Sequence, residues 1–129
     1  MERNDFQKGQ TVWLLLTEWR AHKGDTLEDR IKEYEVVSVG NKYITVRPKG
    51  VDYKGAEVKF SIERDFEHVT KGDPTYVLYL SKDDILKKNR RTEMQRIIRK
   101  AIVLDGMITL YKMSNDDLEQ IAGICKKYL

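Results

Sequence analysis

A chain of 129 residues, 40% hydrophobic and 35% charged, is long enough to bury one hydrophobic core and too short for two. Its hydrophobic content excludes intrinsic disorder, its longest apolar run (Val12–Leu16) excludes a membrane helix, and its single cysteine excludes an intramolecular disulfide. Because the first ten residues also lack the apolar run of a secretory signal, we expect one domain over residues 1–129, no membrane partner and a cytoplasmic location.

Short strands separated by turns are predicted for the first eighty residues. Thr11–Arg20 is rich in β-branched, aromatic and apolar residues, whereas Arg20–Arg30 is polar and predicts an exposed loop. The clearest alternation is at 56–62, where apolar and polar side chains take turns. The predicted strands are Thr11–Arg20, Ile31–Val39, Lys42–Arg47, Ala56–Ile62 and Thr75–Leu80.

A tight hairpin is predicted between the second and third strands. Gly40-Asn41 is a two-residue turn of the type whose twist matches that of paired strands. Five short strands satisfy their edges most economically by curling into a small barrel. The segment from Phe66 to Asp73 is expected to be an irregular connection.

Two helices are predicted after residue 80. Ser81 is followed by two acids, as expected for an N-cap and a first turn, and Ser114 begins a second signal of the same kind. We therefore expect an α+β fold: a small five-stranded antiparallel β-barrel (residues 1–80) followed by two C-terminal α-helices (residues 81–129) packed on it.

The sequence offers little material for catalysis. Its two histidines, His22 and His68, fall in predicted loops, and neither has a serine or cysteine beside it in a nucleophile elbow. His68 is the better candidate of the two, because Asp65 and Glu67 lie nearby. No glycine-rich phosphate loop is present, and the acids at 116–119 are explained as helix-start residues. We predict that the protein is not an enzyme and needs no metal or cofactor.

Positive charge is concentrated in one segment, although the net charge of the chain is only +3. Residues 81–100 contain eight basic and three acidic side chains. On a helix, such residues can bind the phosphates of a nucleic acid or an acidic protein surface, or simply form a solvated face. The candidates for nucleic-acid binding are Lys87, Lys88, Arg90, Arg91, Arg96 and Arg99.

Aromatic and basic residues are mixed along the predicted strands, a composition suited to stacking bases or gripping a peptide. Most of the aromatic side chains are expected in the core. Trp13 shares a strand face with Leu15, whereas Trp19 lies beside the charged loop and is the best candidate for exposure. The candidates for a barrel surface are Trp19, Arg20, Lys42, Arg47 and Tyr53.

The apolar side of the last predicted helix carries Leu118, Ile121 and Cys125. A small buried hydrophobe is the expected role of Cys125. The same stripe could instead pair with its own copy, so a homo-oligomer formed through the C-terminal helix is a second possibility.

The order of these features resembles the small β-barrel proteins encoded by phages and prophages of Firmicutes. The residues that carry the resemblance are Gly9 and Val12, the hairpin Val39–Val46 (VGNKYITV) and Tyr79–Asp83 (YLSKD) before the basic helix. The barrel is also similar to KOW and Tudor domains, which bind nucleic acid, ribosomal or polymerase surfaces, or peptides, although the first strand lacks the second glycine of a typical KOW motif. The resemblance implies a bacterial host cytoplasm.

Two hypotheses follow for function. In the first, a phage or prophage accessory protein binds nucleic acid, or a nucleic-acid-handling complex, through its basic helix. In the second, an inhibitor or adaptor directed at a host protein, such as a counter-defence factor, acts without touching nucleic acid.

Overall fold

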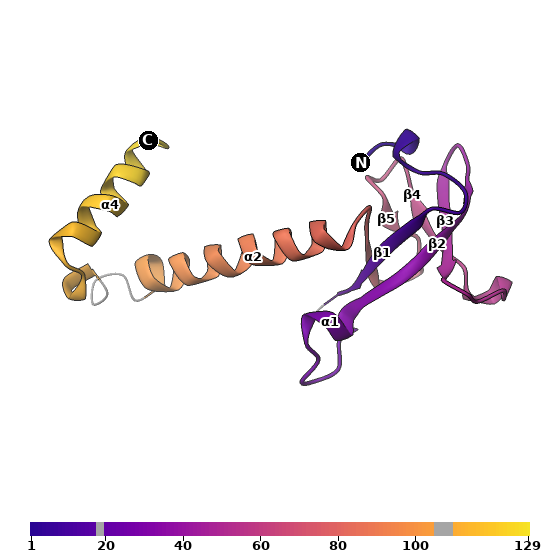
Figure 1. Cartoon of the computed structure of the whole chain (residues 1–129), viewed down its shortest axis with the longest axis horizontal. Helices are drawn as coiled ribbons and strands as arrows, with labels where there is room; N and C mark the ends of the chain where they lie inside the picture. Colours follow the sequence, from indigo (N-terminus) through magenta and orange to yellow (C-terminus); the bar gives the residue numbers. More distant parts are fainter. Residues whose placement is uncertain (18–19, 105–109) are drawn as a thin grey trace. The chain divides into compact units, whose positions relative to one another are not determined.

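The computed structural model describes residues 1–17, 20–104 and 110–129, and it divides into two compact units, Met1–Leu86 and Lys87–Leu129. The first unit contains the sheet and the second is helical (Figure 1). The first unit comprises η1 (Arg3–Asp5), β1 (Thr11–Leu16), α1 (Leu27–Arg30), β2 (Ile31–Val39), β3 (Tyr43–Pro48), η3 (Lys54–Ala56), β4 (Val58–Ser61), β5 (Glu67–His68) and β6 (Tyr76–Tyr79).

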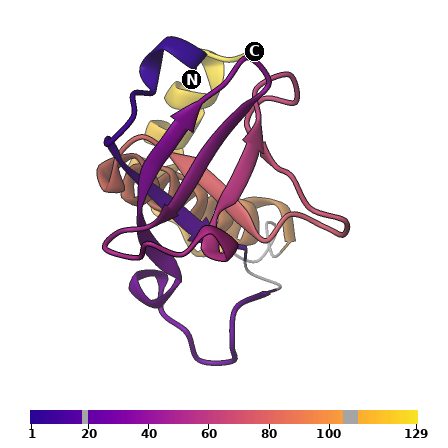
Figure 2. The same cartoon turned by 90° about the vertical axis from the view of Figure 1, so that its right-hand side faces the viewer.

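The six strands form one antiparallel sheet in the order β5-β4-β3-β2-β1-β6, which curls so that it is nearly closed (Figure 2). His68 joins the two edge strands: its Nδ1 accepts a hydrogen bond from the Thr75 N–H at 3.1 Å, and its ring lies 5.7 Å from that of Tyr76. The predicted barrel-like fold is therefore confirmed, but the predicted number of five strands is wrong. Glu67–His68, expected to lie in an irregular connection, forms β5, a strand too short to show alternation.

Alternate residues of the strands fill the core. Each strand sends successive side chains to opposite faces, so that one face points inward. The fully buried members are Val12, Leu14, Val36, Ile44, Val46, Phe60 and Leu78. Tyr34 joins them, and burial and the neighbouring Tyr76 raise its pKa to about 12. The expectation that most aromatic residues of the strands lie in the core is wrong, because Trp13, Tyr43 and Tyr79 point to the outer face.

The β2–β3 hairpin is confirmed, but its tip lies one residue further along the chain than predicted. The Gly40 N–H donates to the Tyr43 carbonyl at 2.9 Å, so that Asn41 and Lys42 form the tip. The register shifts between Val36 and Ser38, which is a β-bulge at Val37. The extra residue shifts the register of β2 against β3 by one position, which places the two-residue turn at Asn41 and Lys42.

A one-turn helix, α1, lies in the segment that was predicted to be a loop. The Thr26 hydroxyl accepts from the Asp29 N–H, and the Thr26 backbone N–H and hydroxyl donate to the Asp29 carboxylate at 2.8 and 2.9 Å. These hydrogen bonds lower the pKa of Asp29. Reciprocal bonding of this kind is a capping box, whose threonine and acid are three residues apart in the sequence.

Both C-terminal helices begin where the sequence predicts. In α2 (Lys82–Arg99) the Ser81 hydroxyl accepts from the Asp84 N–H, and in α4 (Asn115–Lys126) the Ser114 hydroxyl accepts from the Asp117 N–H, each at 3.1 Å. A π-helical turn, η4 (Lys100–Leu104), continues α2. Among the described residues, no helix is both long and apolar enough to span a bilayer.

Candidate functional site

The basic residues of α2 lie on two faces of the helix. Side chains three or four positions apart are neighbours on a helix surface. Lys88, Arg91 and Arg99 therefore share a face with Thr92, Gln95 and Arg96, and we call this set the basic face. Arg90 lies on the opposite side, in line with Met94, Ile97 and Ala101, and Lys87 lies between the two sides, one turn before both Arg90 and Arg91. The six predicted residues are thus not on one face.

Every residue from Leu86 to Lys100 is exposed. Arg96 forms an ion pair with Glu93 at 2.7 Å. An exposed pair of this kind contributes little stability and gives way readily to another anion. Arg96 can therefore bind another anion in place of Glu93.

The barrel-surface candidates are spread over both ends of the sheet. Lys42 lies at the hairpin tip, whereas Arg47 pairs with Glu35 near the far end of β3 and forms a 3.4 Å ion pair with Asp52. Tyr53, 68% exposed, follows directly, and the exposed Arg20 follows β1, which ends on the same side as Arg47. Trp19 lies outside the described residues. Lys42 is thus separated from the other described candidates.

An apolar surface on the outside of the barrel was missed. Trp13 lies opposite Tyr79 and Leu15 lies opposite Val77, all on the face of the sheet that points away from the core. The Lys82 ammonium sits 5.9 Å from the centre of the Trp13 ring and 2.9 Å from a Glu28 carboxylate oxygen. The signal was the unbroken apolar run Val12–Leu16, because a strand with one solvated face would alternate.

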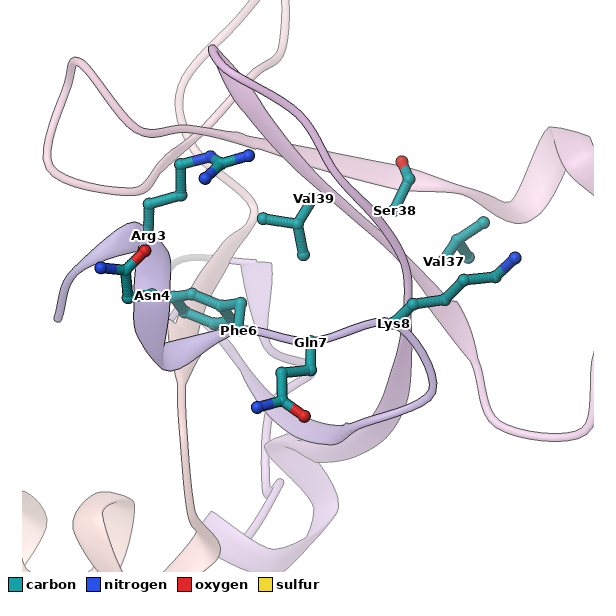
Figure 3. Close-up of a pocket in the computed structure, with 8 residues that line it drawn as sticks. All are labelled: Arg3, Asn4, Phe6, Gln7, Lys8, Val37, Ser38 and Val39. Carbon is teal, nitrogen blue, oxygen red and sulfur yellow. The ribbon is translucent and has the colours of Figure 1, made fainter.

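A pocket of about 470 Å³ lies where the N-terminal segment crosses the bulged part of β2. Phe6 and Val39 form part of its lining. Figure 3 shows Arg3 and Lys8 extending to well-separated positions rather than converging on one point. The Arg3 Nε also donates to the Gly40 carbonyl at 2.8 Å. The pocket therefore does not gather its two cations around one ligand position.

A second pocket, of about 400 Å³, lies beside β5 and has a mixed lining. Glu63, Arg64, Glu67 and His68 line it together with Tyr43 and Ser61. The adjoining Asp65 and Phe66 have backbone φ angles of 54° and 60°, values that residues other than glycine rarely adopt. Among the described residues, no three histidine, cysteine, aspartate or glutamate side chains lie close enough together to hold a metal ion.

The imidazole of His68 predicts a pH dependence for the stability of the barrel. Burial lowers its pKa from the usual 6.5, so the unfolded chain binds the proton more readily than the folded one. Protonation would also remove the acceptor for the Thr75 N–H. The contribution of His68 is present above about pH 6.5 and is lost as the pH falls below the folded pKa. Acidification should lower the melting temperature of His68→Asn by less than that of the wild-type protein. Asparagine keeps a hydrogen-bond acceptor for the Thr75 N–H but does not titrate. Equal acid slopes in the two proteins would contradict this.

The C-terminal unit carries an apolar groove of about 240 Å³. It is lined by Ile97, Ile98, Ala101, Ile102, Met113, Ile121, Ile124 and Cys125. None of the residues at 87–102 and 110–129, for which burial is described, is buried. Cys125 is exposed, so its predicted burial is wrong: the apolar side of α4 lines an open groove rather than a core.

The chain has an α+β fold: a nearly closed antiparallel sheet followed by C-terminal helices. The chain belongs to the Phage ProQ C-terminal-like domain family, whose model matches residues 1–128. The resemblance to phage proteins is thereby confirmed at the level of a phage-associated family. Comparison with curated proteins and with solved structures gives no match.

Proposed function

We propose that this protein is a phage accessory binding protein whose basic face contacts the phosphate backbone of nucleic acid, free or within a nucleic-acid-handling complex. The observation that carries the proposal is the alignment of Lys88, Arg91 and Arg99 on one exposed side of α2.

The spacing of these side chains suits a polyanion. Lys88 and Arg99 are eleven residues apart, which corresponds to about 16 Å along a helix. The major groove of DNA is about 12 Å wide, so the two ends of the basic face can reach phosphates on either side of a groove. Thr92 and Gln95 between them add hydrogen-bond donors. Contacts of this kind position a protein on nucleic acid without reading its sequence.

Removal of the basic face should weaken binding for every sequence alike. We expect the triple substitution Lys88→Gln, Arg91→Gln, Arg99→Gln to lower the affinity for duplex and single-stranded DNA and RNA by at least about tenfold at low salt. The slope of log affinity against log salt should also fall by about 2 to 3, because each lost phosphate contact releases roughly one counterion fewer. Fluorescence anisotropy over a salt series measures both quantities.

A matched control separates a local contact from net charge. Lys8, Lys23 and Lys71 are exposed residues of the barrel unit, and their replacement by glutamine removes the same charge. This control should keep the wild-type salt slope. If wild type shows no binding at low salt, or if both triple variants lose affinity equally, the basic face is not the binding surface.

The second function, an inhibitor or adaptor that binds a host protein, has its own supporting observation. Trp13, Leu15, Val77 and Tyr79 form an outer apolar surface on β1 and β6, and Val77 is 38% exposed. Apolar surface on the outside of a small sheet is typical of a protein contact. This function predicts salt-tolerant binding to one host protein that is lost in Val77→Asp and retained in the triple variant of the basic face.

A further inference from the structure

The apolar groove of the C-terminal unit is built from two sequence-distant segments. Ile97, Ile98 and Ala101 come from the end of α2 and its π-helical continuation, and Ile121, Ile124 and Cys125 come from α4. Ile97, Ile98 and Ile124 are 61%, 57% and 57% exposed. Isoleucine side chains this open, gathered around one groove, indicate a surface that is covered in the functioning protein.

The two units differ in how much of their apolar surface they bury themselves. The barrel unit has a core of side chains that are almost completely inaccessible. None of the residues at 87–102 and 110–129 is buried, although this part of the chain is rich in isoleucine. An amphipathic helix owes most of its stability to the packing of its apolar side. The C-terminal unit therefore needs an occupant for its groove.

Charged residues beside the apolar sides of α2 and α4 indicate what kind of helix could occupy the groove. On α2 the residues Met94, Ile97 and Ala101 form an apolar row along one side of the helix, and the cation Arg90 precedes them in the same row. On α4 the residues Ile121 and Ile124 form a similar apolar row, and the anion Asp117 precedes them in it. If α2 of one copy and α4 of the other run parallel to each other, their apolar side chains face each other and Arg90 lies opposite Asp117. The partner that fits the apolar side of α2 is thus an apolar helix with an acid at its N-terminal end, and α4 is such a helix.

We propose that a second copy of this chain closes the groove, with α4 of each protomer packed on the apolar side of α2 of the other. The two contacts are equivalent and are related by a two-fold axis, as in most homodimers. Lys88, Arg96 and Arg99 lie on the side of α2 away from this contact, whereas Arg91, two turns before Ile98, borders it. The proposal is independent of nucleic-acid binding, and it is tested in the absence of nucleic acid.

Sedimentation velocity of the full chain over a wide concentration range provides the first test. We expect a reversible monomer–dimer equilibrium, and we expect Ile97→Glu and Ile124→Glu each to raise the dissociation constant by at least about tenfold. Val51→Glu is the matched control, since Val51 is an exposed apolar residue of the barrel unit, and it should dissociate as wild type does. Because Ile97 and Ile124 lie outside the barrel unit, the thermal melting of the barrel, followed by its aromatic circular dichroism, should be unchanged in these variants. A monomer at every concentration would overturn the proposal.

A charge swap tests the direction of packing. Arg90→Asp and Asp117→Arg should each weaken the dimer, and the double variant should recover much of the loss, because it restores opposite charges across the contact. Alkylation of Cys125 gives a second readout: its thiol lines the groove and should react more slowly as protein concentration rises. Additive losses in the double variant, or alkylation that is independent of concentration, would contradict an α2–α4 contact between two copies.

Discussion

Replacing Phe60 with alanine is expected to lower the free energy of unfolding by about 3–5 kcal/mol. Phe60 is fully buried in the centre of β4, lies opposite Ile44 of β3, and has its ring 5.6 Å from that of His68. Its removal leaves a cavity between the inner face of the sheet and the residue that joins its two edges. A small domain has a total stability of about 5–15 kcal/mol, so the loss is a large part of it.

Urea denaturation followed by circular dichroism measures this effect. Tyr53→Ala is the control, because it removes an aromatic ring that is 68% exposed and should change stability by no more than about 0.5 kcal/mol. Comparable losses in the two variants would mean that the sheet does not close around Phe60.

Replacing Ile85 with alanine is expected to cost about 2–5 kcal/mol, the second large effect. Ile85 is 1% exposed and is the only buried residue of α2. It belongs to the barrel unit, which ends at Leu86. The first turn of α2 is therefore part of the barrel fold, while the basic face begins just after it.

The neighbouring Leu86 provides the control for Ile85. Leu86 is of the same size and lies on the same helix turn, but it is 40% exposed, so Leu86→Ala should cost less than about 1 kcal/mol. Thermal melting of both variants, read at the aromatic circular dichroism of the barrel, checks the difference. If Leu86→Ala is the more damaging change, the helix is attached to the barrel through its other side.

The parts of the fold that follow from local chemistry could be predicted from the sequence. Ile31–Val39 forms the predicted strand with the predicted bounds, and both helices begin after the serines that cap them. Each of these signals lies within a few residues. The basic segment was also visible in the sequence, because charge is read directly from composition.

The remaining features depend on contacts between distant residues. β5 exists because Phe60 and Ser61 offer it a pairing edge, and two residues carry no periodicity of their own. Both faces of β1 are apolar, so the sequence does not show which of them packs against the core. The outward position of Trp13 depends on that choice. The division of the basic residues between two sides of α2 required the helix to be placed residue by residue, and the open groove of the C-terminal unit could not be foreseen from the apolar stripe of α4.

The joint between β5 and β6 also sets the order in which the barrel comes apart. β5 has two residues and β6 has four, whereas β2 has nine and is paired along both edges. Opening at this joint breaks the fewest backbone hydrogen bonds, so local unfolding begins there and reaches the central strands last. The strands at the edges of such an opening have only two and four residues, and strands this short offer little template for an added strand, so the barrel can open here with little risk of aggregation.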